Sequence, residues 1–127
     1  RVGVSIRHLH VSTLKPFDAA TVVGHAESVH DGVVTLENHV TTGGLGSAVA
    51  EALAEAGLAR RLIRLGLDDT FAHGGSRPYL MRHYGLDAIA LVAAVERLTG
   101  RRTGIDENTL ADVRVDAVHS ATKAEAL

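Results

Sequence analysis

No cysteine and no tryptophan occur among the 127 residues of this chain. Without cysteine, disulfide bonds, thiolate nucleophiles and cysteine-ligated zinc are excluded, and a reducing cytoplasm is the compartment that we expect. Aromatic residues make up only 3% of the sequence, which leaves almost nothing from which to build a stacking platform for single-stranded nucleic acid. No segment approaches the ~20 consecutive apolar residues of a transmembrane helix, so we expect no membrane partner.

Neither sign of charge dominates the sequence. Thirteen lysines and arginines stand against 15 aspartates and glutamates, and the formal net charge of −2 gives no electrostatic reason to bind nucleic acid or an anionic membrane. Hydrophobic residues make up 46% of the chain, which is typical of a folded domain. A chain of this length forms one domain but is small for a complete multi-substrate enzyme, so we expect it to be one part of something larger.

Strand and helix patterns alternate along the first half of the chain. Val2, Val4 and Ile6 alternate with small or polar residues, which predicts a strand, and Asp18 is placed to cap the helix that follows. The unbroken apolar run that begins at Val33 is typical of a central parallel strand buried on both faces. The predicted strands cover residues 2–9, 33–36 and 61–65, and the predicted helices cover residues 19–28 and 46–56. This order predicts an α/β fold, namely a three-layer α/β/α sandwich on a mostly parallel sheet.

The second half of the chain is predicted to be helical. Ser76 caps a short helix that ends at Gly85, and Asp87 caps a longer one that ends before Gly100. The apolar face predicted for the longer helix consists of Ile89, Val92, Ala93 and Leu98. From residue 101 the pattern weakens, and we predict an irregular tail with a short helix over 107–111 and an edge strand over 113–115. The predicted division is therefore an α/β domain over residues 1–100 and a tail over residues 101–127.

A carboxylate and a glycine turn lie between the second predicted strand and the helix after it. Glu37 stands where a ligand crevice can open in an α/β sheet, and its carboxylate could act on a ligand or accept hydrogen bonds from nearby backbone N–H groups. The turn contains Gly43, Gly44, Gly46 and Ser47. It could hold an anion through its amides and the helix dipole, but it lacks a full dinucleotide or Walker pattern, and its glycines also permit close helix packing. Both interpretations stay open.

Eight histidines raise the question of a metal site. His8 and His10 would share one face of the first strand at a spacing that can bind zinc, but the spacing supplies no third ligand and no HExxH-like pattern occurs, so we predict no metal site. Two groups of basic residues could receive an acidic effector or form an ordinary solvated face. They are Arg77, Arg82 and His83 in one group, and Arg60, Arg61 and Arg64 in the other.

Several short motifs occur in a distinctive order. They are Leu14-Lys15-Pro16-Phe17-Asp18, the strand-to-helix run from Val33 to Val49, Leu65-Gly66-Leu67-Asp68-Asp69-Thr70-Phe71, and Tyr84-Gly85-Leu86-Asp87. Together, over residues 4–99, they resemble the C-terminal domain of transketolases. The tail from Val118 to Ala124 resembles the ending of split bacterial transketolases, which are encoded as two shorter subunits. The run from Phe71 to Ser76 is also similar to 1-deoxyxylulose-5-phosphate synthase, which is the alternative within the superfamily.

The resemblance implies an enzyme that uses thiamine diphosphate and a divalent metal to transfer a two-carbon ketol unit between sugar phosphates. In the family the cofactor sits between a pyrophosphate-binding domain and a pyrimidine-binding domain, and neither is present in these residues. The C-terminal domain packs against the pyrimidine-binding domain and supports a homodimer. The resemblance therefore assigns no catalytic residue and no bound cofactor to this chain. A regulatory anion-binding module or a pure interaction module is the alternative from another class.

The start of the chain is late relative to the family pattern. A strand and a helix that usually precede the strand at Val2 are missing, so the domain is expected to be truncated at its N-terminus and to have an exposed sheet edge.

Overall fold

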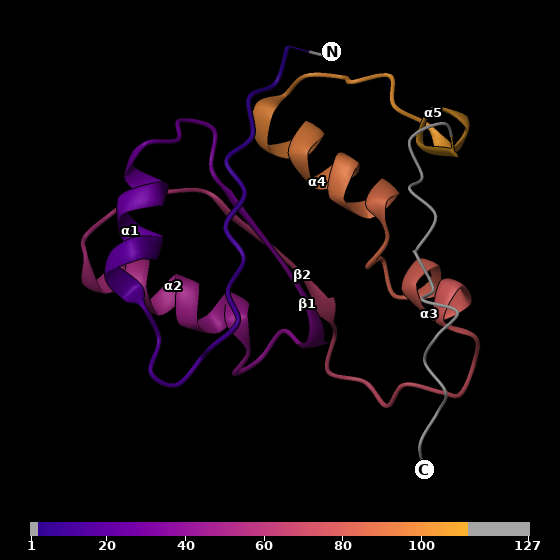
Figure 1. The fold of residues 1–127 in the computed structure, drawn as a ribbon, viewed down its shortest axis with the longest axis horizontal. Coiled ribbons are helices and arrows are strands. Elements are labelled where there is room, and N and C mark those ends of the chain that lie inside the picture. The colour runs from indigo at the N-terminus through magenta and orange to yellow at the C-terminus, as the bar shows by residue number, and fades with distance from the viewer. Residues whose placement is uncertain (1–2, 112–127) are drawn as a thin grey trace, which may run out of the picture.

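The computed structural model describes residues 3–111, which contain two strands and five helices. In chain order the elements are α1 (Ala19–Glu27), β1 (Val33–Val40), α2 (Leu45–Glu55), β2 (Leu62–Leu67), α3 (Arg77–His83), α4 (Ala88–Thr99) and α5 (Glu107–Ala111) (Figure 1). No helix in this part of the chain is long and apolar enough to cross a membrane.

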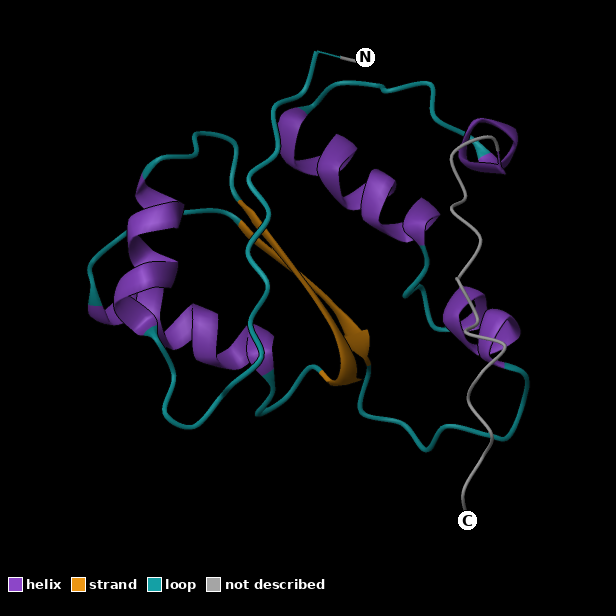
Figure 2. Cartoon of the chain, in the orientation of Figure 1, coloured by secondary structure: helices purple, strands orange, loops and turns teal. Residues whose placement is uncertain are grey.

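The two strands form a parallel pair at the centre of the molecule. Val33 lies opposite Leu62 and Leu36 lies opposite Leu65, and the regular register is interrupted between Leu36 and Val40. Figure 2 shows α1 and α2 on one side of the strands and α4 on the other. This arrangement of helices on both faces of a parallel sheet confirms the predicted α/β class.

The main core lies between α1, α2 and the sheet. Val22 and Ala26 of α1 pack against Val49 and Leu53 of α2, and the exposed fractions of these four residues are between 3% and 7%. Partly buried side chains surround this cluster, and they are Phe17, Val33, Leu45, Leu58 and Leu62. Burying a valine or leucine side chain contributes about 1.5–3 kcal/mol, so this cluster is the main reason that α1 and α2 stay on the sheet.

Helix boundaries follow the capping residues in the sequence. Asp18 accepts a hydrogen bond from the N–H of Thr21 at 3.0 Å, and Asp87 accepts one from the N–H of Ala90 at 2.9 Å. Helix α4 ends at Gly100, whose φ of +67° belongs to the left-handed region that favours glycine. The predicted helix starts at these caps are therefore confirmed.

One predicted strand is wrong, and the predicted apolar face of α4 is right at Leu98 but wrong at Ala93. Residues 4–13 are extended but join no strand ladder, because an alternating apolar pattern creates a strand only where a neighbouring backbone is available to pair with it. In α4, Ala93 is exposed whereas Ala94 is buried, so the face directed at the sheet is Leu91, Ala94, Val95 and Leu98. The short helix over residues 107–111 is confirmed, and the predicted edge strand over residues 113–115 lies outside the described residues.

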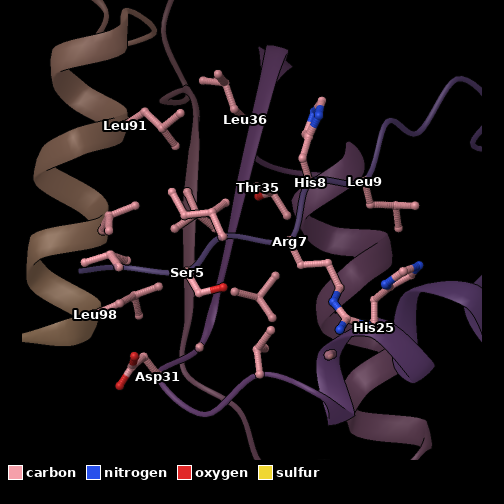
Figure 3. A pocket seen from close by; sticks show the side chains of 18 of the residues that line it. Ser5, Arg7, His8, Leu9, His25, Asp31, Thr35, Leu36, Leu91 and Leu98 are labelled. Atoms are coloured by element: carbon pink, nitrogen blue, oxygen red, sulfur yellow. The ribbon is translucent and has the colours of Figure 1, made fainter. Parts of the chain in front are cut away.

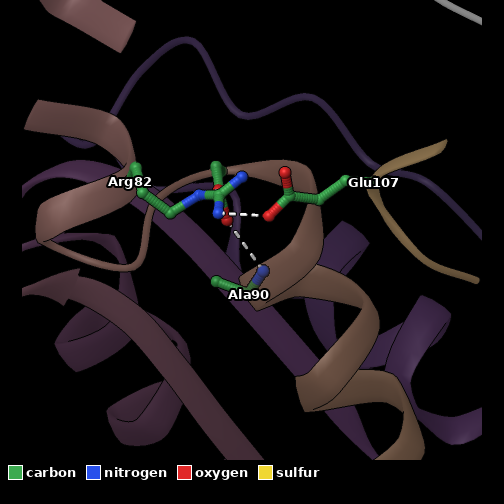
Figure 4. A network of polar contacts seen from close by, with 4 residues as sticks. Arg82, Ala90 and Glu107 are labelled. Atoms are coloured by element: carbon green, nitrogen blue, oxygen red, sulfur yellow. Dashed lines mark hydrogen bonds and ion pairs between the residues drawn. The ribbon is translucent and has the colours of Figure 1, made fainter. Parts of the chain in front are cut away.

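A cluster of charged side chains joins the three C-terminal helices. The Arg82 guanidinium on α3 donates to the carboxylate of Asp87, the cap of α4, and to the carboxylate of Glu107 at the start of α5 (Figure 4). These two carboxylates raise the pKa of Arg82 above its ordinary value. The cluster therefore links α3 to the starts of α4 and α5 through ion pairs that are partly exposed to solvent.

A carboxylate near the end of α4 makes folding stability depend on pH. Glu96 Oε1 accepts hydrogen bonds from the N–H of Thr103 at 2.6 Å and from its hydroxyl at 2.8 Å, and these bonds lower the pKa of Glu96 from its ordinary value of 4.5. A group whose pKa is lowered by folding stabilises the folded state above its ordinary pKa, and this stabilisation is lost as the pH falls through the lowered value.

We predict that Glu96→Gln lowers the melting temperature at neutral pH, and that the difference from the unsubstituted protein narrows as the pH falls below about 4.5. Circular dichroism melts between pH 7 and pH 3 would measure this difference. Glu55→Gln is the matched control, since Glu55 is exposed and accepts no hydrogen bond within residues 3–111. A difference in melting temperature between Glu96→Gln and the unsubstituted protein that stays constant from pH 7 to pH 3 would contradict the stabilising role of the ionised Glu96 carboxylate.

Candidate functional site

The carboxylate predicted from the sequence lies inside a strand and not after it. Strand β1 continues to Val40, and Glu37 lies where its register with β2 is interrupted. This interruption lets the side chain of Glu37 reach the start of α2, eight residues further along the chain. The strand and the glycine turn are therefore brought together by one side chain.

Both carboxylate oxygens of Glu37 are bound by the first amides of α2. The N–H of Leu45 donates to Oε2 at 2.6 Å, and the N–H of Gly46 donates to Oε1 at 2.8 Å. The N-cap residue of α2 is Gly44, which has no side chain to accept these hydrogen bonds. Since the first amides of a helix have no partner within the helix and carry the positive end of its dipole, Glu37 supplies both the missing acceptor and the favoured charge.

The rest of the turn is closed by its own residues. The N–H of Gly43 donates to Ser47 Oγ at 2.9 Å, and the Ser47 hydroxyl donates to the carbonyl of Thr41 at 3.0 Å. Arg64 of β2 donates to the same carbonyl at 2.9 Å. The sequence therefore placed Ser47 in the turn, but nothing in the sequence indicated that Thr41 and Arg64 would complete it.

Two glycines of the turn are required by close approach. A Cβ on Gly44 would lie 2.0 Å from Glu37 Oε2, and a Cβ on Gly46 would lie 2.6 Å from Arg64 Cδ. Gly43 has a φ of +76°, a conformation that other residues rarely adopt. The turn thus needs glycine for conformation at one position and for space at two.

This geometry favours a structural interpretation of Glu37 and of the turn. A phosphate or sulfate at the start of α2 would have to displace a carboxylate that already occupies the amides. The same argument applies to the diphosphate of thiamine diphosphate. This anion would need free N–H donors, whereas these amides already bind the negatively charged Glu37 carboxylate. The residues of the turn do not fit that group.

Of the basic residues that could have received an effector, Arg60, Arg61 and Arg64 bind backbone carbonyls in the structure, whereas Arg82 binds the carboxylates of Asp87 and Glu107. Arg60 donates to the carbonyls of Ala26 and Val29, at 3.2 Å and 3.0 Å, at the end of α1. Arg61 donates to the carbonyls of Arg97 and Leu98, both at 2.9 Å, in the last turn of α4. Cations at helix C-termini complement the helix dipole, so Arg60 and Arg61 stabilise helix ends.

The histidines do not assemble a metal site in the described part of the chain, where no group of three or more His, Asp or Glu side chains could hold an ion. A ring cluster that sequence reasoning missed is formed by His73, Tyr79, His83 and Tyr84, with ring centroids 4.7–5.8 Å apart. The Tyr84 hydroxyl lies 3.0 Å from His73 Nδ1. The only sequence signal was the spacing of Tyr79 and His83 on one helix face.

The fold and the turn together define an α/β domain whose helix N-terminus is neutralised by a carboxylate from its own sheet. The chain matches the transketolase C-terminal domain family over residues 1–91, and it belongs to that family.

Individual relatives carry two different names. The chain is 48% identical over 105 residues to a 1-deoxy-D-xylulose-5-phosphate synthase of Thioalkalivibrio sulfidiphilus, a match that covers 80% of this chain and 16% of the relative. It is 37% identical over 93 residues to a putative transketolase C-terminal section of Methanocaldococcus jannaschii, which covers 73% of this chain and 28% of the relative.

A solved structure described as a split gene transketolase in an inactive beta4 tetramer has the same fold. It superposes with a TM-score of 0.57 at 40% sequence identity, over 69% of this chain and 27% of that one. The chain therefore spans less than a third of the length of each of these three relatives.

We predict that Glu37→Gln lowers the free energy of unfolding by about 1–3 kcal/mol, because one acceptor oxygen becomes an NH₂ group that faces a backbone N–H. Urea denaturation would measure the change. Glu51→Gln is the control. Glu51 is exposed on α2, the helix that Glu37 contacts, and its substitution should change the stability by less than about 0.5 kcal/mol. Equal effects of the two substitutions would contradict the structural role of Glu37.

A second prediction concerns the space at Gly44. Gly44→Ala should destabilise the fold by about 1–3 kcal/mol, because its Cβ would force Glu37 away from the amides of α2. Gly24→Ala in α1 is the matched control: a Cβ there meets no atom within 4 Å, and alanine should stabilise the helix by about 0.5–1 kcal/mol. Thermal melts of both variants would show shifts of opposite sign, and shifts of the same sign would contradict the prediction.

Proposed function

We propose that this chain is the structural, dimer-supporting C-terminal domain of a thiamine diphosphate-dependent enzyme that transfers a two-carbon ketol unit between sugar phosphates. The family match over residues 1–91 and the similarity to a split-gene transketolase support this proposal. The observation that carries the structural role is the Glu37 carboxylate on the amides of Leu45 and Gly46, since it removes the free donors with which the turn could hold a cofactor or effector.

In this proposal the cofactor, the divalent metal and the catalytic residues belong to the pyrimidine-binding and pyrophosphate-binding domains of the same enzyme. The chain spans only 16–28% of the length of the relatives named above, so the rest of such an enzyme lies outside these 127 residues. A homodimer of the assembled enzyme is the expected state. What this chain contributes is a rigid α/β domain that packs beside the domain holding the pyrimidine ring.

A specific observation favours a second candidate. Relatives between 40% and 48% identical bear the name 1-deoxy-D-xylulose-5-phosphate synthase. The loop from Phe71 to Ser76 that precedes α3 also resembles that enzyme. The alternative proposal is therefore the same structural role in an enzyme that forms 1-deoxy-D-xylulose 5-phosphate.

An assembly experiment tests the proposal. The chain alone should show no ketol transfer and no heat of binding when thiamine diphosphate is titrated into it. Mixed with the polypeptide from the same genome that carries the two cofactor-binding domains, it should restore ketol transfer between sugar phosphates. Formation of 1-deoxy-D-xylulose 5-phosphate in place of ketol transfer would select the second candidate. Tight binding of thiamine diphosphate to the chain alone would overturn both.

A further inference from the structure

The loop between β2 and α3, residues 68–76, is held in place by few contacts. All of its residues are exposed, and the side chain of Phe71 is fully exposed. Figure 1 shows the loop running from the end of β2 to α3, on the side of the strands away from α1 and α2. Within residues 3–111, His73 makes the only hydrogen bonds of residues 68–75. The position of the loop therefore depends on what His73 contacts.

One hydroxyl group holds both the backbone and the ring of His73. The N–H of His73 donates to the Tyr84 hydroxyl oxygen at 3.3 Å, and the same oxygen lies 3.0 Å from His73 Nδ1. Because this oxygen accepts from the backbone N–H, its own proton is available for donation to Nδ1. Such a pairing requires a neutral imidazole whose proton is on Nε2. The contact joins the loop to the end of α3, since Tyr84 is the C-cap of that helix.

Protonation of His73 removes the acceptor from this contact. An imidazolium donates at both ring nitrogens, so Nδ1 would then direct a proton at the Tyr84 hydroxyl. The hydroxyl proton would lose its partner, and two N–H donors of one residue would converge on one oxygen. Histidine is the side chain whose charge ordinarily changes between about pH 5 and pH 8. The contact is therefore favoured at the upper end of this range and opposed at the lower end.

A second histidine increases the effect of protonation. The ring centroid of His83 on α3 lies 5.0 Å from that of His73, with an interplanar angle of 85°. Neutral rings in this edge-to-face arrangement attract each other. When both rings bind protons, two positive charges lie at the same separation and repel. The two histidines thus hold the loop against α3 when they are neutral and push it away when they are charged.

The charged side chains nearby do not neutralise such a pair. The loop carries Asp68 and Asp69, and neither forms an ion pair within residues 3–111. Helix α3 adds the positive charges of Arg77 and Arg82. The carboxylates that approach from the cap of α4 and from α5 are bound by Arg82. No carboxylate is therefore paired with either imidazole in this part of the molecule.

We infer that the contact between His73 and Tyr84 is a pH-dependent fastening of the loop over residues 68–76. The loop is held against α3 while His73 and His83 are neutral, and it is released when they bind protons. Its release changes Phe71 from a fixed apolar projection into a mobile one. The helices stay in place, because neither the core between α1 and α2 nor the ion pairs of Arg82 involve these histidines. The fastening needs no ligand, so it is independent of the function proposed above.

Backbone dynamics of the full chain labelled with ¹³C test this inference. Relaxation of the Cα nuclei is suitable because their hydrogens do not exchange with water. The order parameters of Phe71 and Gly74 should be about 0.85 at about pH 8, as in a rigid backbone, and should fall below about 0.6 at about pH 5. Those of Val22 and Val49 in the core should stay near 0.85 at both pH values, which shows that the domain remains folded.

The tyrosines give a second measurement. Tyr79 and Tyr84 are the only tyrosines of the chain, which has no tryptophan, and both belong to the ring cluster. The near-ultraviolet circular dichroism of tyrosine therefore reports on this cluster alone. It should weaken by about twofold between about pH 8 and pH 5, while the far-ultraviolet signal of the helices stays unchanged.

Matched histidine variants test which ring is responsible. His73→Asn keeps the backbone N–H that binds Tyr84 and removes the ring that binds a proton, so the order parameters of the loop should agree at the two pH values. His8→Asn is the control. His8 is exposed and lines a pocket between residues 3–11 and β1, away from α3 (Figure 3). Its replacement should leave the pH response intact.

A third variant tests the hydroxyl. Tyr84→Phe keeps the ring and removes the only hydrogen-bond partner that His73 has within residues 3–111, so the loop should be mobile at both pH values. Three results would overturn the inference. They are order parameters of Phe71 that do not change with pH in the unsubstituted chain, a pH response that persists in His73→Asn, and a loop that stays rigid in Tyr84→Phe.

Discussion

The contact between the Glu37 carboxylate and the first amides of α2 is the interaction on which the rest of the structure depends. It joins the strand to the helix that covers it, and it does so at the point where β1 loses its register with β2. Without an acceptor there, the start of α2 would leave backbone donors unpaired beside a sheet face. With it, Val49 and Leu53 are held over the strands and can form the core with α1.

Much of this architecture could be predicted from the sequence because local signals set it. Asp18 and Asp87 mark helix starts through a side chain that bonds three residues ahead, and the apolar run at Val33 marks a strand covered on both faces. The strand predicted over residues 2–9 failed for the opposite reason. Pairing is a property of the neighbour, and the alternation of Val4 and Ile6 contains no information about whether a neighbour is present.

The site shows the same division between local and distant information. The need for small residues in the turn was visible in the sequence, whereas the roles of Thr41 and Arg64 depend on where β2 passes the turn. The role of the basic residues was ambiguous, because the sequence does not distinguish an arginine that binds an anionic ligand from one that binds the carbonyls at a helix end. Their positions after helices become meaningful only once the chain has folded back on itself.

Arg60 and Arg61 are neighbours in the chain, yet they bind helices on opposite faces of the sheet. One reaches the end of α1 and the other the end of α4, just before β2 begins. Two adjacent residues therefore link both outer layers to the start of β2, in addition to the apolar core that holds α1 and α2 on the sheet. The two helical layers are thereby coupled at one point of the chain, so a local opening there would weaken the attachment of both layers at once.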